Sequence, residues 1–141
     1  MNETTPSGDH PAGGSAIAAA ATPTCFALLG NPNTGKTTLF NRLCGIRAKT
    51  ANFPGSTVEA RIGRCTIGDE PRRVVDLPGI YGLNLDRPES RTCRDYLHGT
   101  VRLGEPPEAA VIVADATNLE RNLIFVSQAL QQDLPAVVAL N

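Results

Sequence analysis

The stretch Gly-Asn-Pro-Asn-Thr-Gly-Lys-Thr-Thr, residues 30–38, decides the fold of this 141-residue chain. It fills every fixed position of the phosphate-loop pattern G-x-x-x-x-G-K-[ST]. Glycines let backbone N–H groups approach phosphate oxygens, the charge of Lys36 suits the β- and γ-phosphates, and the Thr37 hydroxyl can complete a Mg²⁺ shell. The sequence therefore predicts a phosphate site made of Gly30, Asn31, Pro32, Asn33, Thr34, Gly35, Lys36, Thr37 and Thr38.

The residues on either side of this loop have the pattern that a phosphate loop requires. Residues 25–29 are a short apolar run, which predicts a buried parallel strand. Residues 38–44 carry apolar side chains at a helical spacing, and Gly45 is a natural helix stop. Strand, loop and helix in this order disfavour a chance match to the pattern.

Composition narrows the class of protein. Hydrophobic residues make up 41% of the chain and charged residues 19%, which is typical of a soluble globular protein. The formal net charge of −1 does not support a nucleic-acid or membrane-surface partner, since either favours a basic excess. No run approaches the roughly 18 apolar residues of a membrane helix. The four cysteines lie far apart in the sequence, so neither a zinc site nor a disulfide framework is expected.

The domain boundary is predicted near residue 24. Residues 1–23 are rich in Gly, Ser, Thr, Pro and Ala and hold almost no large apolar side chain. Such a segment cannot bury enough surface to offset its ordering entropy, so we expect a disordered tail. Residues 24–141 are then expected to form one nucleotide-binding domain.

Residues 46–57 have turn chemistry without periodicity. They predict either a plain connecting loop or a mobile loop whose threonine reaches Mg²⁺ when a γ-phosphate is bound. Thr57 is the first candidate because it directly precedes a predicted strand, and Thr50 and Ser56 are the alternatives.

An antiparallel hairpin is predicted next, with strands over 58–67 and 72–76 and a turn at 68–71. Val58, Ala60 and Ile62 alternate onto one side of the first strand. Gly63 interrupts this alternation, which predicts a bulge.

The second motif is Asp76-Leu77-Pro78-Gly79. An aspartate that ends a strand about 40 positions after the phosphate-loop lysine can hold Mg²⁺, usually through water. Gly79 can offer its N–H to the γ-phosphate without a side chain in the way. The next residue is Ile80, whereas many GTPases place there a glutamine that orients the attacking water. Isoleucine offers no hydrogen bond, so another group must position the water.

The rest of the chain predicts an alternation of helices and strands. Residues 81–107 are expected to be a second mobile segment with a helical piece over 88–98, and strands follow over 109–115 and 134–140. A helix between those strands should face the sheet with Leu119, Leu123, Val126 and Leu130. The fold class is therefore α/β, a P-loop NTPase with a doubly wound, mostly parallel sheet that contains one antiparallel strand.

These motifs resemble small GTPases of the translation-factor-related class and, more narrowly, the N-terminal GTPase domain of the ferrous iron transport protein B (FeoB) family. The resemblance runs from about residue 25 to the end of the chain. It rests on five pieces: GNPNTGKTTLFN (30–41), NFPGSTVE (52–59), VDLPGIYGL (75–83), RDYL (94–97) and DATNLERNL (115–123).

The resemblance implies roles for individual residues. Lys36, Thr57 and Gly79 would act in catalysis, and Thr37, Thr57 and Asp76 would serve the Mg²⁺ ion. Asn33 would hold a K⁺ ion beside the phosphates, although an ordinary turn also explains an asparagine there. The nucleotide would further contact Asn52, Phe53, Pro54, Gly55, Ser56, Thr57, Asp76, Leu77, Pro78, Gly79 and Asn141.

The same resemblance implies a function, with GTP or GDP, Mg²⁺ and K⁺ as cofactors. Slow GTP hydrolysis would regulate or drive Fe²⁺ uptake by a C-terminal membrane domain, at the cytoplasmic face of the inner membrane. Asn141 matches the first residue of the guanine-reading N-x-x-D motif, whose Asp would follow residue 141, so we expect a fragment of a longer protein. If the chain were the whole molecule, the open sheet edge at 136–140 would be an association hazard, and an oligomer is a possible state.

Three other functions remain open on the residues alone. A soluble GTPase of ribosome assembly or RNA modification shares the phosphate loop and the D-x-P-G motif. A nucleotide-sensing module would bind without appreciable turnover, and an ATP-specific enzyme is the remaining alternative.

Overall fold

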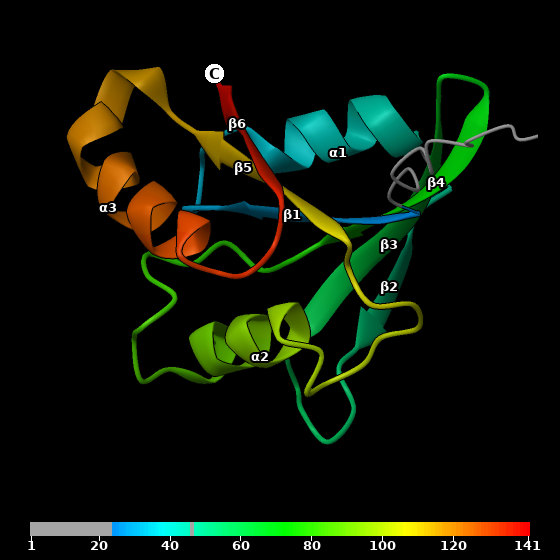
Figure 1. Cartoon of the computed structure of the whole chain (residues 1–141), viewed down its shortest axis with the longest axis horizontal. Helices are drawn as coiled ribbons and strands as arrows, with labels where there is room; N and C mark the ends of the chain where they lie inside the picture. The colour runs from blue at the N-terminus through cyan, green and yellow to red at the C-terminus, as the bar shows by residue number, and fades with distance from the viewer. Residues whose placement is uncertain (1–23, 46) are drawn as a thin grey trace, which may run out of the picture.

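A six-stranded sheet forms the centre of the molecule (Figure 1). The computed structural model describes residues 24–45 and 47–141, so the tail predicted at 1–23 lies outside the described residues, as does residue 46. The strand order is β2-β3-β4-β1-β5-β6. The elements in chain order are β1 (Cys25–Gly30), α1 (Lys36–Cys44), β2 (Lys49–Asn52), β3 (Glu59–Ile67), β4 (Glu70–Asp76), α2 (Pro88–Leu97), β5 (Ala109–Ala114), the 3₁₀ turn η1 (Ala116–Asn118), α3 (Leu119–Leu130) and β6 (Ala136–Leu140).

The pairing of the strands confirms the predicted doubly wound sheet. β1 lies between β4 and β5 and is parallel to both, and β5 is parallel to β6. β3 alone runs against its neighbours β2 and β4. The β3–β4 hairpin turns at Gly68 and Asp69, whose φ angles of 58° and 65° are those of a two-residue hairpin loop.

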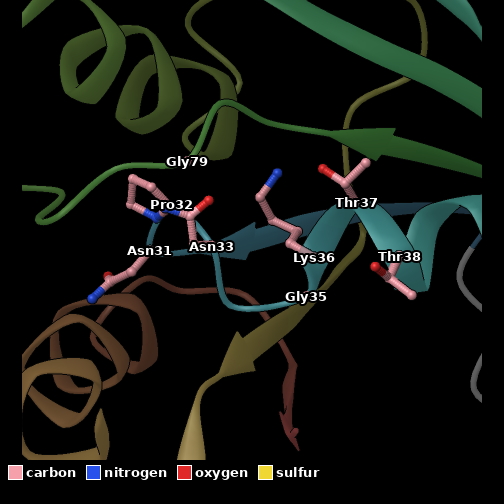
Figure 2. Close-up of a pocket in the computed structure, with 8 residues that line it drawn as sticks. All are labelled: Asn31, Pro32, Asn33, Gly35, Lys36, Thr37, Thr38 and Gly79. Carbon is pink, nitrogen blue, oxygen red and sulfur yellow. The ribbon is translucent and has the colours of Figure 1, made fainter. Parts of the chain in front are cut away.

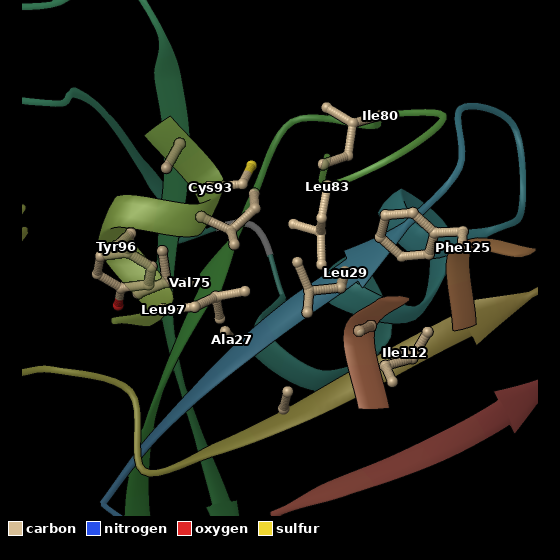
Figure 3. Close-up of a cluster of buried hydrophobic side chains, with 14 of the residues drawn as sticks. Ala27, Leu29, Val75, Ile80, Leu83, Cys93, Tyr96, Leu97, Ile112 and Phe125 are labelled. Atoms are coloured by element: carbon tan, nitrogen blue, oxygen red, sulfur yellow. The ribbon is translucent and has the colours of Figure 1, made fainter. Parts of the chain in front are cut away.

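Helices cover both faces of the sheet, so successive residues of β1 enter two different cores. Ala27 and Leu29 belong to the larger cluster, which packs beneath α2 and α3 (Figure 3). Leu28 faces the other way and packs with Phe40 of α1 and Val74 of β4. Burial on both faces explains why residues 25–29 read as a continuous apolar run. No helix within residues 24–45 and 47–141 is both long and apolar enough to cross a membrane.

The prediction for the sheet-facing side of α3 was wrong. Leu119, Leu123 and Leu130 are 41%, 51% and 53% exposed, whereas Val126 is buried as expected. Asn122 sets the rotation of the helix, because its side chain accepts a hydrogen bond from the N–H of Asp115 and donates to the carbonyl of Asn118. The residues that share its buried side are Phe125, Val126 and Ala129.

Two predictions near β3 also need correction. The segment 46–57 is not a plain loop, because β2 lies within it and pairs Lys49–Asn52 with β3. Gly63 does not form a bulge, since the register between β3 and β4 continues through it without interruption. A Cβ atom at Gly63 would lie only 2.5 Å from Cβ of Cys44, so close packing against α1 explains the glycine.

Candidate functional site

The phosphate loop connects the end of β1 to the start of α1 and depends on its glycines. Gly35 is the N-cap of α1 and has φ 90°, a conformation that favours glycine. A Cβ at Gly30 would lie 2.7 Å from the carbonyl oxygen of Val113 on the neighbouring strand. Asn33 also has a positive φ of 63°, which asparagine tolerates better than most residues. The loop thus leads into the N-terminus of α1, a position that favours binding of an anion.

A cavity of about 450 Å³ opens beside this loop (Figure 2). Lys36 and Thr37 extend from the start of α1 toward the segment after β4, as Figure 2 shows. The lining consists of predicted residues, which are Asn31, Pro32, Asn33, Gly35, Lys36, Thr37, Thr38 and Gly79. The size and the convergence of hydroxyl, ammonium and backbone N–H groups suit a chain of phosphates.

Lys36 is fixed by two acceptors at the end of β4. Its ammonium forms an ion pair with Asp76 and donates a hydrogen bond of 2.5 Å to the carbonyl of Leu77. Both charged side chains are buried, so the pair holds the ammonium between α1 and β4. Asp76 does not line the cavity itself, but it lies directly behind the Lys36 side chain that does.

The D-x-P-G turn is attached to the phosphate loop through backbone contacts. The N–H of Ile80 donates to the carbonyl of Gly30 at 3.2 Å. A Cβ at Gly79 would lie 3.0 Å from Cα of Pro32, so this glycine permits the close approach of the two loops. The Ile80 side chain is buried in the larger core and does not line the phosphate cavity.

The side chains of Asn31 and Thr34 make contacts within and beside the loop, and their phosphate contacts stay a prediction. Thr34 is buried, and its hydroxyl donates to the carbonyl of Asn31 at 3.1 Å. The Asn31 side chain points toward α3 and away from Lys36 (Figure 2). It lines a second polar cavity with Asp115, a carboxyl group whose pKa is lowered by hydrogen bonds from the hydroxyl and N–H of Thr117.

The structure does not bring residues 52–57 to the phosphate cavity. Thr57 is exposed and is absent from the lining, so its role at Mg²⁺ stays a prediction. Ser56 accepts a hydrogen bond from the N–H of Val58, which closes the turn. Phe53 is 1% exposed and contacts the Tyr96 ring edge-on at 5.5 Å between centroids. Phe53 therefore anchors this turn in the core.

Asn141 lies against the phosphate loop, more than a hundred positions away in sequence. Its side-chain amide donates to the carbonyl of Thr34 at 3.1 Å, and its N–H donates to Ala114 at the end of β5. A cavity of about 290 Å³ adjoins the phosphate cavity here. Its lining is Gly35, Thr38, Leu39, Arg42, Val113, Ala139, Leu140 and Asn141, of which the sequence motifs identified three.

The residues present fit a Mg²⁺ ion that is shared with phosphates. The Thr37 hydroxyl lines the cavity, and the Asp76 carboxylate lies behind Lys36. Mg²⁺ commonly takes one or two protein oxygens and completes its shell with phosphates and water. Within the described residues, no group of three or more His, Cys, Asp or Glu side chains could hold a metal ion alone.

Comparison with known proteins identifies the family. Residues 24–141 match the model of ferrous iron transport protein B. Over 82% of this chain, 44% of the residues are identical to the Fe(2+) transport protein A/Fe(2+) transporter FeoB fusion protein of Porphyromonas gingivalis. Over 81% of this chain, 43% are identical to the Fe(2+) transporter FeoB of Escherichia coli K12. It spans 13% and 15% of the length of those two relatives.

Solved structures give the same result. The G domain of T. maritima FeoB superimposes with a TM-score of 0.74 at 35% identity, covering 83% of this chain and 70% of that one. A GDP-bound mutant of S. thermophilus NFeoB superimposes with a TM-score of 0.73 at 42% identity, covering 84% and 43%. The chain belongs to the ferrous iron transport protein B family, and its residues 24–141 correspond to the N-terminal G domain of that family.

Proposed function

We propose that residues 24–141 form a domain that binds GTP and GDP with Mg²⁺ and hydrolyses GTP slowly. The observation that carries this proposal is the cavity beside the phosphate loop, which Lys36, Thr37 and Gly79 line together. GDP-bound relatives such as the S. thermophilus mutant support a guanine nucleotide as the ligand. The cavity beside Asn141 would then take the base.

Catalysis would rest on positioning and on electrostatic stabilisation. Lys36 would hold the β- and γ-phosphates, and the N–H groups of the loop and of Gly79 would hold the oxygens on which charge develops. Mg²⁺, when bound, would neutralise charge shared by the β- and γ-phosphates. Thr37 would ligate it directly, with Asp76 nearby, and Thr57 would join when residues 52–57 close over the nucleotide.

The attacking water would be positioned without a side chain at residue 80, because Ile80 is buried. A K⁺ ion would be a second source of positive charge, and Asn33, which lines the cavity, could hold it beside the phosphates. We therefore propose that K⁺ stimulates hydrolysis.

The family relation suggests what the nucleotide cycle serves. Its relatives are Fe(2+) transporters several times longer than this chain. We propose that the cycle regulates or drives uptake of Fe²⁺ by a membrane domain of the full-length protein, with this domain at the cytoplasmic face of the inner membrane. Oligomerisation of that protein is a further part of the proposal.

The direct experiment measures nucleotide binding and phosphate release for the chain and for Lys36→Ala. GTP and ATP compete for the site in the presence of Mg²⁺, and phosphate release is compared in K⁺ and Na⁺. We expect GTP to be preferred and Lys36→Ala to abolish binding. Arg102→Ala is the matched control, because it removes one exposed positive charge outside the cavity. Tight binding by Lys36→Ala would refute the phosphate site, and preference for ATP would refute the guanine assignment.

A further inference from the structure

Two cysteines that are far apart in the sequence meet on the α1 side of the sheet. Cys44 is the last residue of α1 and Cys65 belongs to β3; both are free and partly buried. A Cβ at Gly63 would lie 2.5 Å from Cβ and 2.7 Å from Sγ of Cys44, so Cys44 sits directly on β3. Cys65 is two positions from Gly63 and therefore points to the same face of the strand.

Both thiols pack against the same cluster of Leu28, Phe40 and Val74. The neighbouring Cys65 helps to raise the pKa of Cys44 to about 11, after the larger effect of burial. Burial also raises the pKa of Cys65, while the neighbouring Cys44 acts in the opposite direction. The other two cysteines, Cys25 and Cys93, are 0% exposed and belong to the opposite core.

Cys44 is reachable from solvent through a basic depression. Cys44 lines a cavity of about 510 Å³ together with Arg47, Lys49, Ile62, Gly63, Arg64 and Arg73. Among the described residues, this lining includes four basic residues and no acidic one. Arg64 and Arg73 are directly opposite each other in the β3–β4 register, a like-charge pairing that costs stability in a sheet. The Arg73 guanidinium already donates hydrogen bonds to the carbonyls of Leu103 and Glu105, so Arg47, Lys49 and Arg64 are the basic residues that remain to attract a small anion.

The two cysteines flank the segment that carries the predicted Mg²⁺ ligand Thr57. Cys44 ends the helix that begins at Lys36, and Cys65 lies in the strand that follows Thr57. A bond between the two sulfur atoms would therefore close a ring through residues 45–64, the segment that contains Thr57. It would tie the far end of α1 to β3 and shorten the free chain that carries the predicted Mg²⁺ ligand.

We propose that Cys44 and Cys65 are a redox pair that a small anionic disulfide oxidises to an intramolecular disulfide. The Cys44 thiolate attacks one sulfur of the disulfide RSSR, forms a mixed disulfide and releases RS⁻, which takes up a proton. The Cys65 thiolate then attacks the Cys44 sulfur and releases the second RS⁻. Two protein thiols are oxidised, one RSSR is reduced to two RSH, and no other reactant is needed.

The surroundings also predict that the pair reacts slowly. Only thiolates attack disulfides, and with a pKa near 11 few Cys44 thiols are ionised at neutral pH. Arg61 on β3 favours the Cys44 thiolate, while Asp76 on β4 opposes it. Such a pair responds to sustained oxidation and stays reduced through brief exposure.

The test uses 5,5′-dithiobis(2-nitrobenzoate), an anionic disulfide whose leaving thiolate is coloured, on the folded chain of residues 1–141. We expect two coloured thiolates released per chain with none left on the protein. In Cys65→Ser, one thiolate is released and one remains bound to Cys44. After trypsin, mass spectrometry should find residues 43–47 joined to residues 65–72 in the wild type. A stable mixed disulfide on wild-type Cys44, or no reaction at Cys44, would overturn the proposal.

A second arm tests the basic depression separately. Cystamine is a cationic disulfide and should react more slowly than the anionic probe. Replacing both Lys49 and Arg64 by alanine should slow the anionic probe about three- to tenfold and leave cystamine unchanged or faster. Equal slowing of both probes would show that access, and not charge, governs the reaction.

The oxidised wild type should also melt several degrees higher than the reduced form, a shift that Cys44→Ser and Cys65→Ser must both lack.

Discussion

Lys36 and Asp76 form a buried ion pair directly behind the phosphate cavity, with side chains that are 8% and 5% exposed. One partner is the predicted phosphate ligand and the other is the predicted neighbour of Mg²⁺. A phosphate that draws the Lys36 ammonium into the cavity must compete with Asp76 and with the Leu77 carbonyl. If Lys36 binds phosphate as proposed, nucleotide binding would be coupled to the end of β4, and through it to the turn at Gly79.

Replacing Asp76 by asparagine should expose this competition. Removal of one partner of a buried pair leaves the Lys36 charge uncompensated, which should cost about 3 kcal/mol or more of folding stability. Bound phosphates would supply the missing negative charge. Added GDP without Mg²⁺ should therefore raise the melting temperature of Asp76→Asn more than that of the wild type.

The control for this experiment is Asp86→Asn. Asp86 pairs with Arg91 at 3.5 Å, but its side chain is 92% exposed, so its loss should leave the melting temperature nearly unchanged. Equal stabilisation of Asp76→Asn and the wild type by GDP would show that the ion pair and the phosphates do not compete.

Phe53 is the subject of a separate prediction. Its side chain is buried in the core, which indicates a structural role, whereas the family resemblance implies a contact with the nucleotide. Phe53→Ala should cost about 3–5 kcal/mol in chemical denaturation, since it empties a site that packs against Tyr96. At a temperature where the variant is folded, its GDP affinity should stay within about twofold of the wild type. Phe53→Leu should recover most of the stability. A large loss of GDP affinity in folded Phe53→Leu would instead support direct contact with the nucleotide.

Thr57 is exposed in the structure, and its role depends on closure of residues 52–57. If it ligates Mg²⁺ beside a γ-phosphate, Thr57→Ala should weaken Mg²⁺–GTP binding or turnover by about tenfold or more while GDP binding changes little. Thr50→Ala and Ser56→Ala are the matched hydroxyl deletions, and both should have small effects. Equal losses for GTP and GDP, or a larger effect at residue 50, would remove Thr57 from the metal shell.

The part of the fold that could be predicted is the part that local chemistry determines. Gly30, Gly35 and Lys36 fix a phosphate loop by residue type and spacing, and the apolar run at 25–29 fixes the strand before it. The hairpin turn at Gly68 and Asp69 follows the same logic, since few other residues accept two positive φ angles in succession. These features need no information from the rest of the chain.

The features that were missed depend on tertiary contacts. β2 has mostly exposed residues without alternation, and it exists because β3 offers it an edge. The rotation of α3 is set by hydrogen bonds of Asn122, which outweigh the leucine spacing. The meeting of Cys44 with Cys65, and of Asn141 with Thr34, likewise appears only once the sheet is assembled.

Asn33 carries the last prediction, which concerns potassium. Its side chain lines the phosphate cavity, and its backbone has φ 63°, so a substitution changes both the amide and the backbone strain. Asn33→Gly removes the amide and keeps the conformation, whereas Asn33→Ala also adds strain of about 1 kcal/mol. Both variants should hydrolyse GTP in K⁺ no faster than in Na⁺, and only Asn33→Ala should also lose stability. Rates measured in the two salts at equal ionic strength decide the matter. Stimulation by K⁺ that persists in Asn33→Gly would place the ion elsewhere, whereas stimulation lost only in Asn33→Ala would trace the effect to the shape of the loop and not to the amide.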